Sequence, residues 1–372
     1  MAEEMAQAQP RLTAPRSVRC IVKLGGAAIT NKGELESINE ENLRSACAQL
    51  RHAMSESDGD GAMEKVLGMD WSRKPGDPVD PAVDAEWIAG IARLGLDTNF
   101  VVVHGAGSFG HFQASRSGVH KGGLHSTLVK AGFVATRISV TSLNQEIVRA
   151  LAREGIPSVG MSPFACGWST QQRKLASANA SQIFQSLHAG FVPVSCCSKG
   201  FEPLFLQNFI FIKNRAWCSG SLSTCCLEIL EKLSKGLYHI EWGCHYTTSC
   251  TASESEICSI SGTTDVHGVY DRPPTDSNAV LLREIEVDDI GGWSIVKPAL
   301  LQGNTKGVEI SVAAHDTTGG METKILEAAV IARLGIDVYI TKAGTEHSLR
   351  ALKGDVSTDS EDWLGTIIRS SK

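Results

Sequence analysis

Short apolar runs alternate with longer segments of helical spacing along most of the chain. The run at 100–103 is apolar in four successive positions, which is typical of a strand covered on both faces. Similar short runs lie at 19–22, 156–161, 191–194 and 338–341. Apolar residues at helical spacing predict helices at 39–54, 86–94, 124–154, 178–189, after 320 and at 348–352. This alternation predicts an α/β sandwich with a mostly parallel central sheet.

Two of the predicted strands run directly into glycine-rich turns. The first gives KLGGA at Lys23–Ala27, with a second lysine at Lys32, and the second gives HGAGSFGH at 104–111. Glycines adopt backbone angles that other residues avoid and let main-chain N–H groups approach an anion. A third turn, TTGG at 317–320, opens a helix that carries Lys324 one turn in. Each turn fits a phosphate site, although a tight turn with solvated lysines would also explain the first pattern alone.

Composition and charge narrow the class of protein. The 372 residues are 42% hydrophobic, which is enough for a substantial core. A net charge of −6 and a pI near 6.0 argue against nucleic acid or an anionic membrane as a partner. Residues 1–17 include Glu3 and Glu4 and lack an apolar core, which predicts a disordered start and a cytosolic protein. The longest apolar run, at 203–212, is too short to span a bilayer.

Two segments differ from the rest in composition. Residues 55–83 are rich in Gly, Asp, Ser and Pro, which predicts a surface insertion. Of eleven cysteines, eight lie between 196 and 258, close to His239 and His245. A zinc site is one explanation, but no CxxC pair occurs with metal-ligand spacing, so we predict no metal site formed by these residues. The length of the chain and its apparent lack of an export signal favour reduced thiols.

The glycine-rich motifs occur in an order that resembles a known family. KLGGA with Lys32, VHGAGSFGH, TDVHGVY and DTTGGMETK together resemble the amino acid kinase superfamily, and within it the plant-type isopentenyl phosphate kinases. The resemblance covers about 19–194 and 264–371, and no P-loop sequence GxxxxGK(S/T) occurs. It implies a three-layer α/β/α sandwich and transfer of phosphate from ATP, with Mg²⁺, to isopentenyl phosphate in isoprenoid biosynthesis. It also implies a homodimer.

The same resemblance implies roles for particular residues. The first glycine turn would line the ATP phosphates with Lys23, Leu24, Gly25, Gly26 and Ala27. Three residues from the second half of the chain would also contact ATP: Asp265, Gly320 and Lys324. Ala106 and Gly107 would lie where acceptor and nucleotide meet. Lys32 would neutralise the transferring group, and His111 would donate a hydrogen bond to the acceptor phosphate. Lys23, Lys32 and His111 are therefore the catalytic candidates.

His111 decides which acceptor the resemblance implies. A histidine at this place resembles the branch that phosphorylates a phosphate, whereas related kinases of carboxylates need no such group. Alone, the same residue would more often cap the following helix or pack beneath it. His104 is interpreted as a core or supporting residue and is left out of the site. The alternatives are a kinase of another small phosphate or phosphonate, or a non-catalytic ligand-binding protein.

The tract at about 195–261 does not match the resemblance. It replaces an expected His-Gly-Asp turn, an SGD motif and a final strand with a cysteine-rich sequence. Codons chosen for GLYHIEWGCHYTT, at 236–248, give GCTILSGDVIIR when read one base later, and 255–261 can likewise give QKYVVFL. We therefore hypothesise a poorly ordered tract in a shifted reading frame. It would separate an acceptor-binding half at 18–194 from an ATP-binding half at 262–372, and would impair nucleotide binding.

Overall fold

A computed structural model describes most of both predicted halves. The residues that it describes are 18–55, 95–119, 122–171, 174–177, 180–197, 259–264, 266–298, 320–356 and 362–371. The predictions for 1–17, for the insertion beyond Ser55, for a helix at 86–94 and for 198–258 lie outside these residues.

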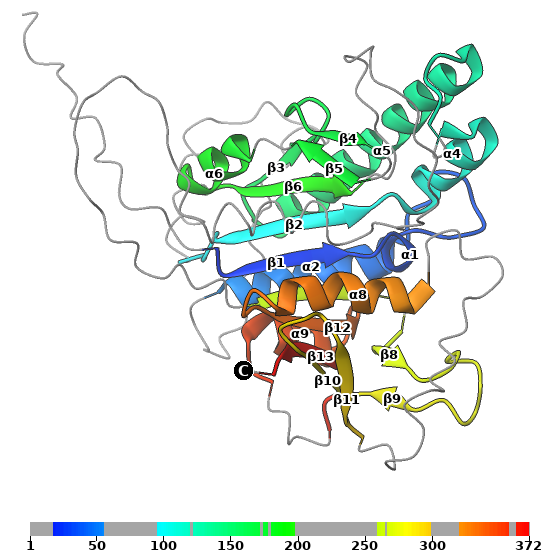
Figure 1. Ribbon diagram of the computed structural model, residues 1–372. Coiled ribbons are helices and arrows are strands. Elements are labelled where there is room, and N and C mark those ends of the chain that lie inside the picture. Colours follow the sequence, from blue (N-terminus) through cyan, green and yellow to red (C-terminus); the bar gives the residue numbers. More distant parts are fainter. Residues whose placement is uncertain are drawn as a thin grey trace, which may run out of the picture.

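One nine-stranded sheet runs through the described part of the chain, in the order β11-β10-β13-β12-β7-β1-β2-β6-β3 (Figure 1). Its strands are β1 (Cys20–Leu24), β2 (Phe100–Gly105), β3 (Ser158–Met161), β6 (Val192–Cys197), β7 (Ser259–Thr264), β10 (Glu284–Val287), β11 (Trp293–Lys297), β12 (Asp337–Lys342) and β13 (Thr366–Ser370). Successive neighbours from β12 to β3 pair in parallel, whereas β13 and β11 bring antiparallel pairs to one edge. The predicted mostly parallel sheet is confirmed.

Two short hairpin-like pairs lie outside the main sheet. They are β4 (Ser169–Gln171) with β5 (Lys174–Ser177), and β8 (Val269–Tyr270) with β9 (Leu281–Leu282). Both pairs are antiparallel. They extend the connections between sheet strands and leave the parallel centre unchanged.

Helices cover both faces of the sheet. They are α1 (Gly26–Ile29), the 3₁₀ turn η2 (Gly107–Phe109), α4 (His111–Ser117), α2 (Glu40–Met54), α5 (Thr127–Arg153), α6 (Ser181–His188), α8 (Gly320–Ala332) and α9 (Glu346–Lys353). One core unites the sheet with α6 and α8, and the other unites it with α1, α2, α5 and Leu352 of α9. The three-layer sandwich is therefore confirmed.

The start of α2 shows how local sequence sets a helix boundary. Asn39 precedes the helix, and its side-chain oxygen accepts a hydrogen bond from the Asn42 N–H at 3.0 Å. Glu40 and Glu41 lie in the first turn and Arg51 in the last, which is the arrangement that complements the helix dipole. The helix buries Leu43, Ala46, Cys47, Leu50, Ala53 and Met54. The predicted helix at 39–54 is confirmed.

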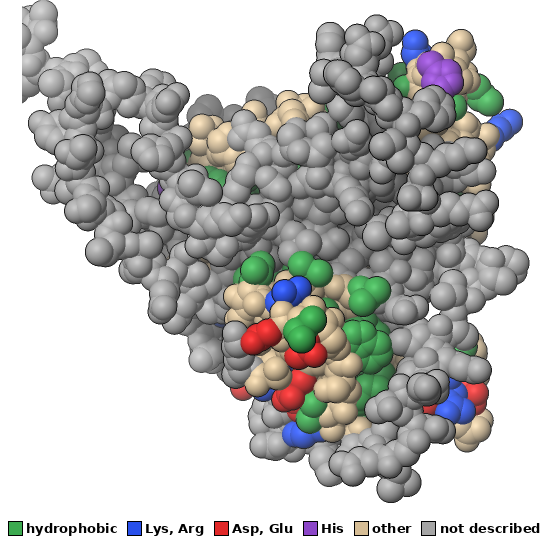
Figure 2. Space-filling view, in the orientation of Figure 1, with side chains coloured by type: hydrophobic (Ala, Val, Ile, Leu, Met, Phe, Trp, Pro, Cys, Tyr) green, Lys and Arg blue, Asp and Glu red, His purple; other side chains and the backbone are tan. Residues whose placement is uncertain are grey.

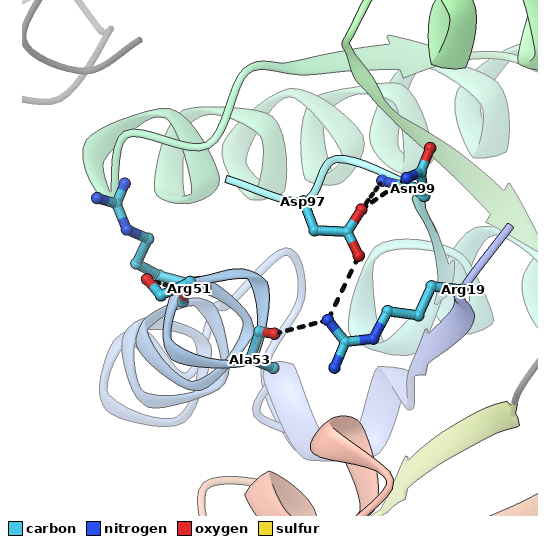
Figure 3. Close-up of polar contacts among 6 residues, drawn as sticks. Arg19, Arg51, Ala53, Asp97 and Asn99 are labelled. Atoms are coloured by element: carbon cyan, nitrogen blue, oxygen red, sulfur yellow. Dashed lines mark hydrogen bonds and ion pairs between the residues drawn. The ribbon is translucent and has the colours of Figure 1, made fainter. Parts of the chain in front are cut away.

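Polar contacts fix the entry of β1 and β2 into the sheet (Figure 3). The Arg19 guanidinium donates to the Ala53 carbonyl and to the Asp97 carboxylate, both at 3.3 Å. Asp97 in turn accepts from the backbone and side-chain N–H groups of Asn99, at 3.0 and 2.7 Å. Because Arg19 precedes β1 and Asn99 precedes β2, this cluster holds the two strands in register at their amino ends.

The face that carries α8 has hydrophobic side chains at its surface, with charged residues among them (Figure 2). Leu326, Val330 and Leu334 follow one another at four-residue spacing on or just after α8, and each is 43–47% exposed. Among the described residues, none of the helices combines the length and the apolar character needed to span a bilayer.

Most predicted elements are present with small shifts at their ends. β6 continues to Cys197, and β7 begins at Ser259, so each end of the unmatched tract contributes to a sheet strand. The strands β10, β11 and β13 and the pair β4–β5 were not predicted. They are short, and apolar alternation over four or five residues is a weak signal.

Candidate functional site

The candidate site lies at the carboxyl ends of the central strands. The chain extends the sheet from β1 through β2, β6 and β3 on one side, and through β7 and β12 on the other. The order of the strands therefore reverses at β1, and ligands of such sheets bind beyond the carboxyl ends at the reversal. KLGGA leaves β1 at this position and HGAGSFGH leaves β2 beside it, so the fold brings the first two predicted glycine turns together.

The turn after β1 places backbone amides at the mouth of the site. Gly25 precedes α1, and its carbonyl accepts from the N–H groups of Ala28 and Ile29 at 2.9 and 3.2 Å. The first N–H groups of a helix have no acceptor within the helix, so they are suited to bind an anion. Lys23 is half-buried on β1, whereas Ala27 is exposed.

The two glycine turns touch through their backbones. A Cβ on Gly26 would lie 2.4 Å from the Gly107 nitrogen, and one on Gly105 would lie 2.7 Å from the Gly26 nitrogen. Gly107 also has a positive φ of 49°, and its Cβ would lie 2.2 Å from Thr30 Oγ1. Any larger residue at these positions would force the turns apart, which explains why glycine is required here.

The loop that carries Lys32 is fastened to the turn after β2. Thr30 Oγ1 donates to the Gly26 carbonyl at 2.7 Å and accepts from the Ser108 N–H at 3.0 Å. Ser108 Oγ donates to the Ser37 carbonyl at 3.1 Å and accepts from the Ser37 N–H at 3.3 Å. Because Ser108 is buried and Lys32 is exposed, the loop is held at its base while its lysine faces outward.

A second contact joins the same loop to α4. Gln113 donates to the Glu36 carboxylate at 3.2 Å and to the Ser139 hydroxyl at 3.1 Å. Glu36 has a φ of 53°, an uncommon backbone conformation for a residue other than glycine. His111 is the first residue of α4 and is exposed, so the helix that carries it is linked to the loop of Lys32.

His104 lies beneath the turn after β2, in agreement with its interpretation as a core or supporting residue. It is fully buried at the end of β2, and its Nδ1 lies 3.1 Å from the Gly105 carbonyl oxygen. Its Nε2 lies 3.0 Å from the Asn144 side-chain nitrogen, which also donates to the Val194 carbonyl at 3.0 Å. Burial lowers the pKa of His104 to about 4, so the ring is neutral. A histidine at the end of an otherwise apolar strand was the available signal.

The nucleotide side of the predicted site is described in part. Gly320 is the first residue of α8 and Lys324 lies within that helix, but the Lys324 side chain and Asp265 lie outside the described residues. At the end of β7, the single proton of Thr264 Oγ1 is shared between the Val266 carbonyl at 2.5 Å and the Thr341 carbonyl at 3.3 Å. These contacts join the ends of β7 and β12.

A histidine pair lies next to the ends of β7 and β12 and was not predicted. The rings of His267 and His347 are 6.0 Å apart between centroids. Burial lowers the pKa of His267, and the nearby charges of Lys342 and His347 lower it further. The lowered pKa favours the neutral form of the His267 ring.

An apolar cluster adjoins the acceptor side. Phe133 of α5 packs edge-to-face against Phe164 with 5.7 Å between centroids, and it also belongs to a cluster with Val119. The Arg137 guanidinium lies 4.6 Å from the centre of the Phe164 ring and donates to Ser162 Oγ at 3.0 Å. Such a surface suits an apolar substrate tail, as the sequence led us to expect of this helix.

The described residues hold no group of three His, Cys, Asp or Glu side chains that could bind a metal ion. The donors near the two glycine turns are amides and lysines, which suit phosphate oxygens. A Mg²⁺ ion that accompanies a nucleotide takes most of its ligands from phosphates and water, so it fits such a site without a protein cage.

Comparisons with known proteins agree with the geometry. The amino acid kinase family model matches residues 82–203 and 246–342. The chain is 53% identical over 360 residues to the isopentenyl phosphate kinase of Arabidopsis thaliana, an alignment that covers 96% of this chain and 97% of that protein. It is 27% identical over 288 residues to the isopentenyl phosphate kinase of Methanothermobacter thermautotrophicus, which covers 75% and 91%. The resemblance inferred from the motifs is confirmed. The family match is interrupted only at 204–245, so the segment that departs from the family is shorter than the predicted tract at about 195–261.

Solved structures show the same fold. X-ray structures of isopentenyl phosphate kinase align with a TM-score of 0.56 and 22% identity over 94% of this chain and 99% of theirs. The product complex of T. acidophilum isopentenyl phosphate kinase aligns with a TM-score of 0.53 and 16% identity, over 94% of this chain and 99% of that chain. At these identities the likeness supports the fold alone.

Proposed function

Because the chain belongs to the amino acid kinase family and to its isopentenyl phosphate kinases, we propose that it transfers the γ-phosphoryl group of ATP to isopentenyl phosphate. The products are ADP and isopentenyl diphosphate, an intermediate of isoprenoid biosynthesis. The observation that carries the proposal is the contact between the Gly26 and Gly107 turns at the carboxyl ends of β1 and β2. Two neighbouring anion sites are what a transfer between two phosphates requires.

The residues of the site act by alignment and charge. Phosphoryl transfer needs an in-line arrangement and stabilisation of charge on the transferring oxygens more than it needs a covalent nucleophile. Lys23 and the amides of Gly25–Ala27 bind the ATP phosphates, and Lys32 neutralises the transferring group. His111 holds the acceptor phosphate beside Ala106 and Gly107. Mg²⁺, bound with ATP, supplies further positive charge at the phosphates.

An ATP-dependent assay with isopentenyl phosphate tests the proposal directly. We expect ADP and isopentenyl diphosphate in equal amounts from the purified chain. In the His111→Ala variant, the KM for isopentenyl phosphate rises about tenfold or more, because a charge-assisted contact to the acceptor is lost. The His188→Ala variant removes an exposed histidine of α6 and is the matched control. Unchanged kinetics in His111→Ala contradict the role of that residue.

Other acceptors and a non-catalytic role are outcomes of the same assay. A panel of small phosphates and phosphonates identifies a kinase of another acceptor if one of them has a higher kcat/KM than isopentenyl phosphate. Nucleotide binding without any ADP release identifies a ligand-binding protein.

The unmatched tract belongs to the proposal as well. We interpret about 195–261 as a segment read in a shifted frame, between an acceptor-binding half at 18–194 and an ATP-binding half at 262–372. The family model supports this interpretation for 204–245, where its match is interrupted, whereas 195–203 and 246–261 lie within the match. The KM for ATP and the turnover of the given sequence are compared with those of a version that carries the frame-restored segment. We expect a lower KM for ATP in the restored version. The interpretation is overturned if the two versions have equal KM values for ATP and the sequenced transcript encodes the tract in frame.

The enzyme is also proposed to be a cytosolic homodimer. Leu128, Val134 and Ile138 of α5 are 55–65% exposed, which supports a covered apolar face. Light scattering should give twice the mass of the 39.8 kDa chain, and Ile138→Glu should shift it toward the monomer. A monomeric wild-type protein contradicts the proposal. A fluorescent fusion tests the location.

A further inference from the structure

The end of β2 carries a hydrogen-bonded chain whose direction can be assigned. A carbonyl oxygen only accepts hydrogen bonds, so the contact from His104 Nδ1 to the Gly105 oxygen requires a proton on Nδ1. The neutral ring then has a lone pair on Nε2, which accepts from the Asn144 amide at 3.0 Å. The second N–H of that amide donates to the Val194 carbonyl. Each donor in the chain therefore has one acceptor, and the tautomer is fixed.

This row of hydrogen bonds determines the orientation of one peptide unit in the turn after β2. The Gly105–Ala106 peptide is planar and trans, so its C=O and N–H point in opposite directions. With its oxygen held by His104, the Ala106 N–H points away from the buried ring. Ala106 is half-buried and begins the tight turn that contacts Gly26, at the junction of the two proposed phosphate sites.

We propose that His104 and Asn144 are positioning residues that hold the Gly105–Ala106 peptide so that the Ala106 N–H donates to the transferring phosphoryl group. The inference rests on the proposed function, because it names a residue pair that supports that reaction. His104 is fully buried and Asn144 is nearly so, hence neither touches substrate and both act through the peptide. A donor oriented before the reaction stabilises the transition state without reorganisation.

Two substitutions at His104 separate positioning from packing. In His104→Asn, the side-chain nitrogen occupies the place of Nδ1, so it can donate to the Gly105 carbonyl, but the contact with Asn144 is lost. In His104→Gln, the side-chain oxygen reaches the place of Nε2 and accepts from Asn144, but the donor to Gly105 is lost. Both variants remove one of the two contacts of the buried ring, so they form a matched pair.

The expected result is a difference in turnover between the pair. We expect kcat in His104→Asn to stay within about threefold of the wild type, and kcat in His104→Gln to fall at least about tenfold, with the KM for ATP unchanged in both. Melting temperatures measured in parallel report the structural cost. The proposal is overturned if His104→Gln turns over as fast as His104→Asn, or if turnover in both simply follows the melting temperature.

A measurement on the unmodified chain covers the case in which the variants do not fold. Nitrogen-15 spectra of histidine-labelled protein should show one ring with a slowly exchanging N–H, as expected for a fully buried group, and with the proton on Nδ1. A proton on Nε2 of that ring overturns the proposal. A wild-type chain without kinase activity contradicts the proposed function instead, and the spectra still decide the tautomer.

Discussion

The two strands that flank β1 share one register and differ in nearly every side chain. Val22 of β1 lies opposite Val102 of β2 on one side and opposite Ser261 of β7 on the other. β2 has the sequence FVVVHG, and its first five residues are fully buried. β7 has the sequence SISGTT and contains one apolar residue, Ile260. The hydrogen-bonding partner is the same strand in both cases, yet the two strands bring very different side chains to the sheet.

The difference separates what forms a strand from what stabilises it. Ladder hydrogen bonds are made by the backbone and accept almost any sequence without proline. Burial of an apolar side chain contributes about 1.5–3 kcal/mol, and parallel strands covered on both faces are usually apolar throughout. The next neighbours of β7 on the other side, Val338 and Tyr339, are buried, so its position calls for apolar residues. Its polar sequence agrees with the proposed shift of reading frame.

The largest expected effect comes from giving β2 the composition of β7. In Val102→Ser, two methyl groups are lost and a hydroxyl is buried without a designed partner, so we expect the free energy of unfolding to fall by about 4 kcal/mol. Guanidinium unfolding measures the change. Val330→Ser on the surface of α8, where the side chain is 43% exposed, is the control and should change stability by less than about 0.5 kcal/mol. A loss at Val102 no larger than in the control would remove the energetic contrast.

The second largest expected effect is a pH dependence of the free energy of unfolding that arises from β2 and not from β7. Leu24 lies opposite His104 in β2 and opposite Thr263 in β7, and only the histidine titrates. Burial lowers the pKa of His104 from 6.5 to about 4, so between these values the unfolded state binds the extra proton and the folded state does not. The contribution of His104 to the free energy of unfolding is therefore fully present above pH 6.5, and the free energy falls by about 3 kcal/mol as the pH drops to 4.

The pH effect of His104 is isolated by a difference measurement. Denaturant unfolding of the wild type and of His104→Asn at pH 7.0, 5.5 and 4.5 removes the contribution of all other groups. The wild type should lose more stability than the variant at each step toward acid. Parallel pH profiles would show that the ring is protonated equally in the folded and unfolded states.

Local sequence predicted the elements whose patterns are long, and it missed contacts between distant residues. The 27-residue α5 and the fully buried β2 carry repeated signals, so both were predicted close to their observed bounds. The edge strands β10, β11 and β13 have four or five residues each, and their position depends on pairing rather than on local pattern. The fold class therefore followed from the sequence, whereas the antiparallel edge did not.

The candidate site shows the same limit. Glycine turns mark the ends of β1 and β2 in the sequence, because only glycine tolerates the contact that the structure shows between Gly26 and Gly107. The contact between His104 and Asn144 spans 40 residues, and that between Ser37 and Ser108 spans 71. No local pattern encodes such pairs, since strand order and helix placement bring them together. The roles assigned to Lys23, Lys32 and His111 stay predictions until the variants are measured.

A smaller effect should follow from giving β7 some of the composition of β2. Ser261 occupies a position between Val22 and Tyr339 in the register, both buried. Ser261→Val should raise the free energy of unfolding by about 1.5 kcal/mol, because valine favours β structure and its register neighbours on both sides are buried. Ser261→Ala is the control and should give about half of that gain or less. Destabilisation by valine, with no gain from alanine, would mean that the polar residue is required at this position.

The smallest expected effect comes from the hydroxyl contacts at the carboxyl ends of β2 and β7. At the end of β2, Ser108 Oγ joins the loop of Lys32 through the backbone of Ser37. At the end of β7, Thr264 Oγ1 donates to the carbonyl of Thr341 near the end of β12. Ser108→Ala should lower the free energy of unfolding by about 1 kcal/mol, because it removes both hydrogen bonds between Ser108 Oγ and the Ser37 backbone, and should lower kcat severalfold through Lys32.

Kinetic analysis of paired variants distinguishes the contacts at the end of β2 from those at the end of β7. Ser108→Ala should act on kcat and on the KM for isopentenyl phosphate, whereas Thr264→Val should act on the KM for ATP, since it loosens the nucleotide side alone. Ser37→Ala keeps the backbone groups that bind Ser108, so it serves as the control for the β2 side and should retain more turnover than Ser108→Ala. If Ser37→Ala loses as much turnover as Ser108→Ala, the Lys32 loop is held by its own side-chain contacts, Asn31 and Glu34 with Ser37, rather than by the end of β2.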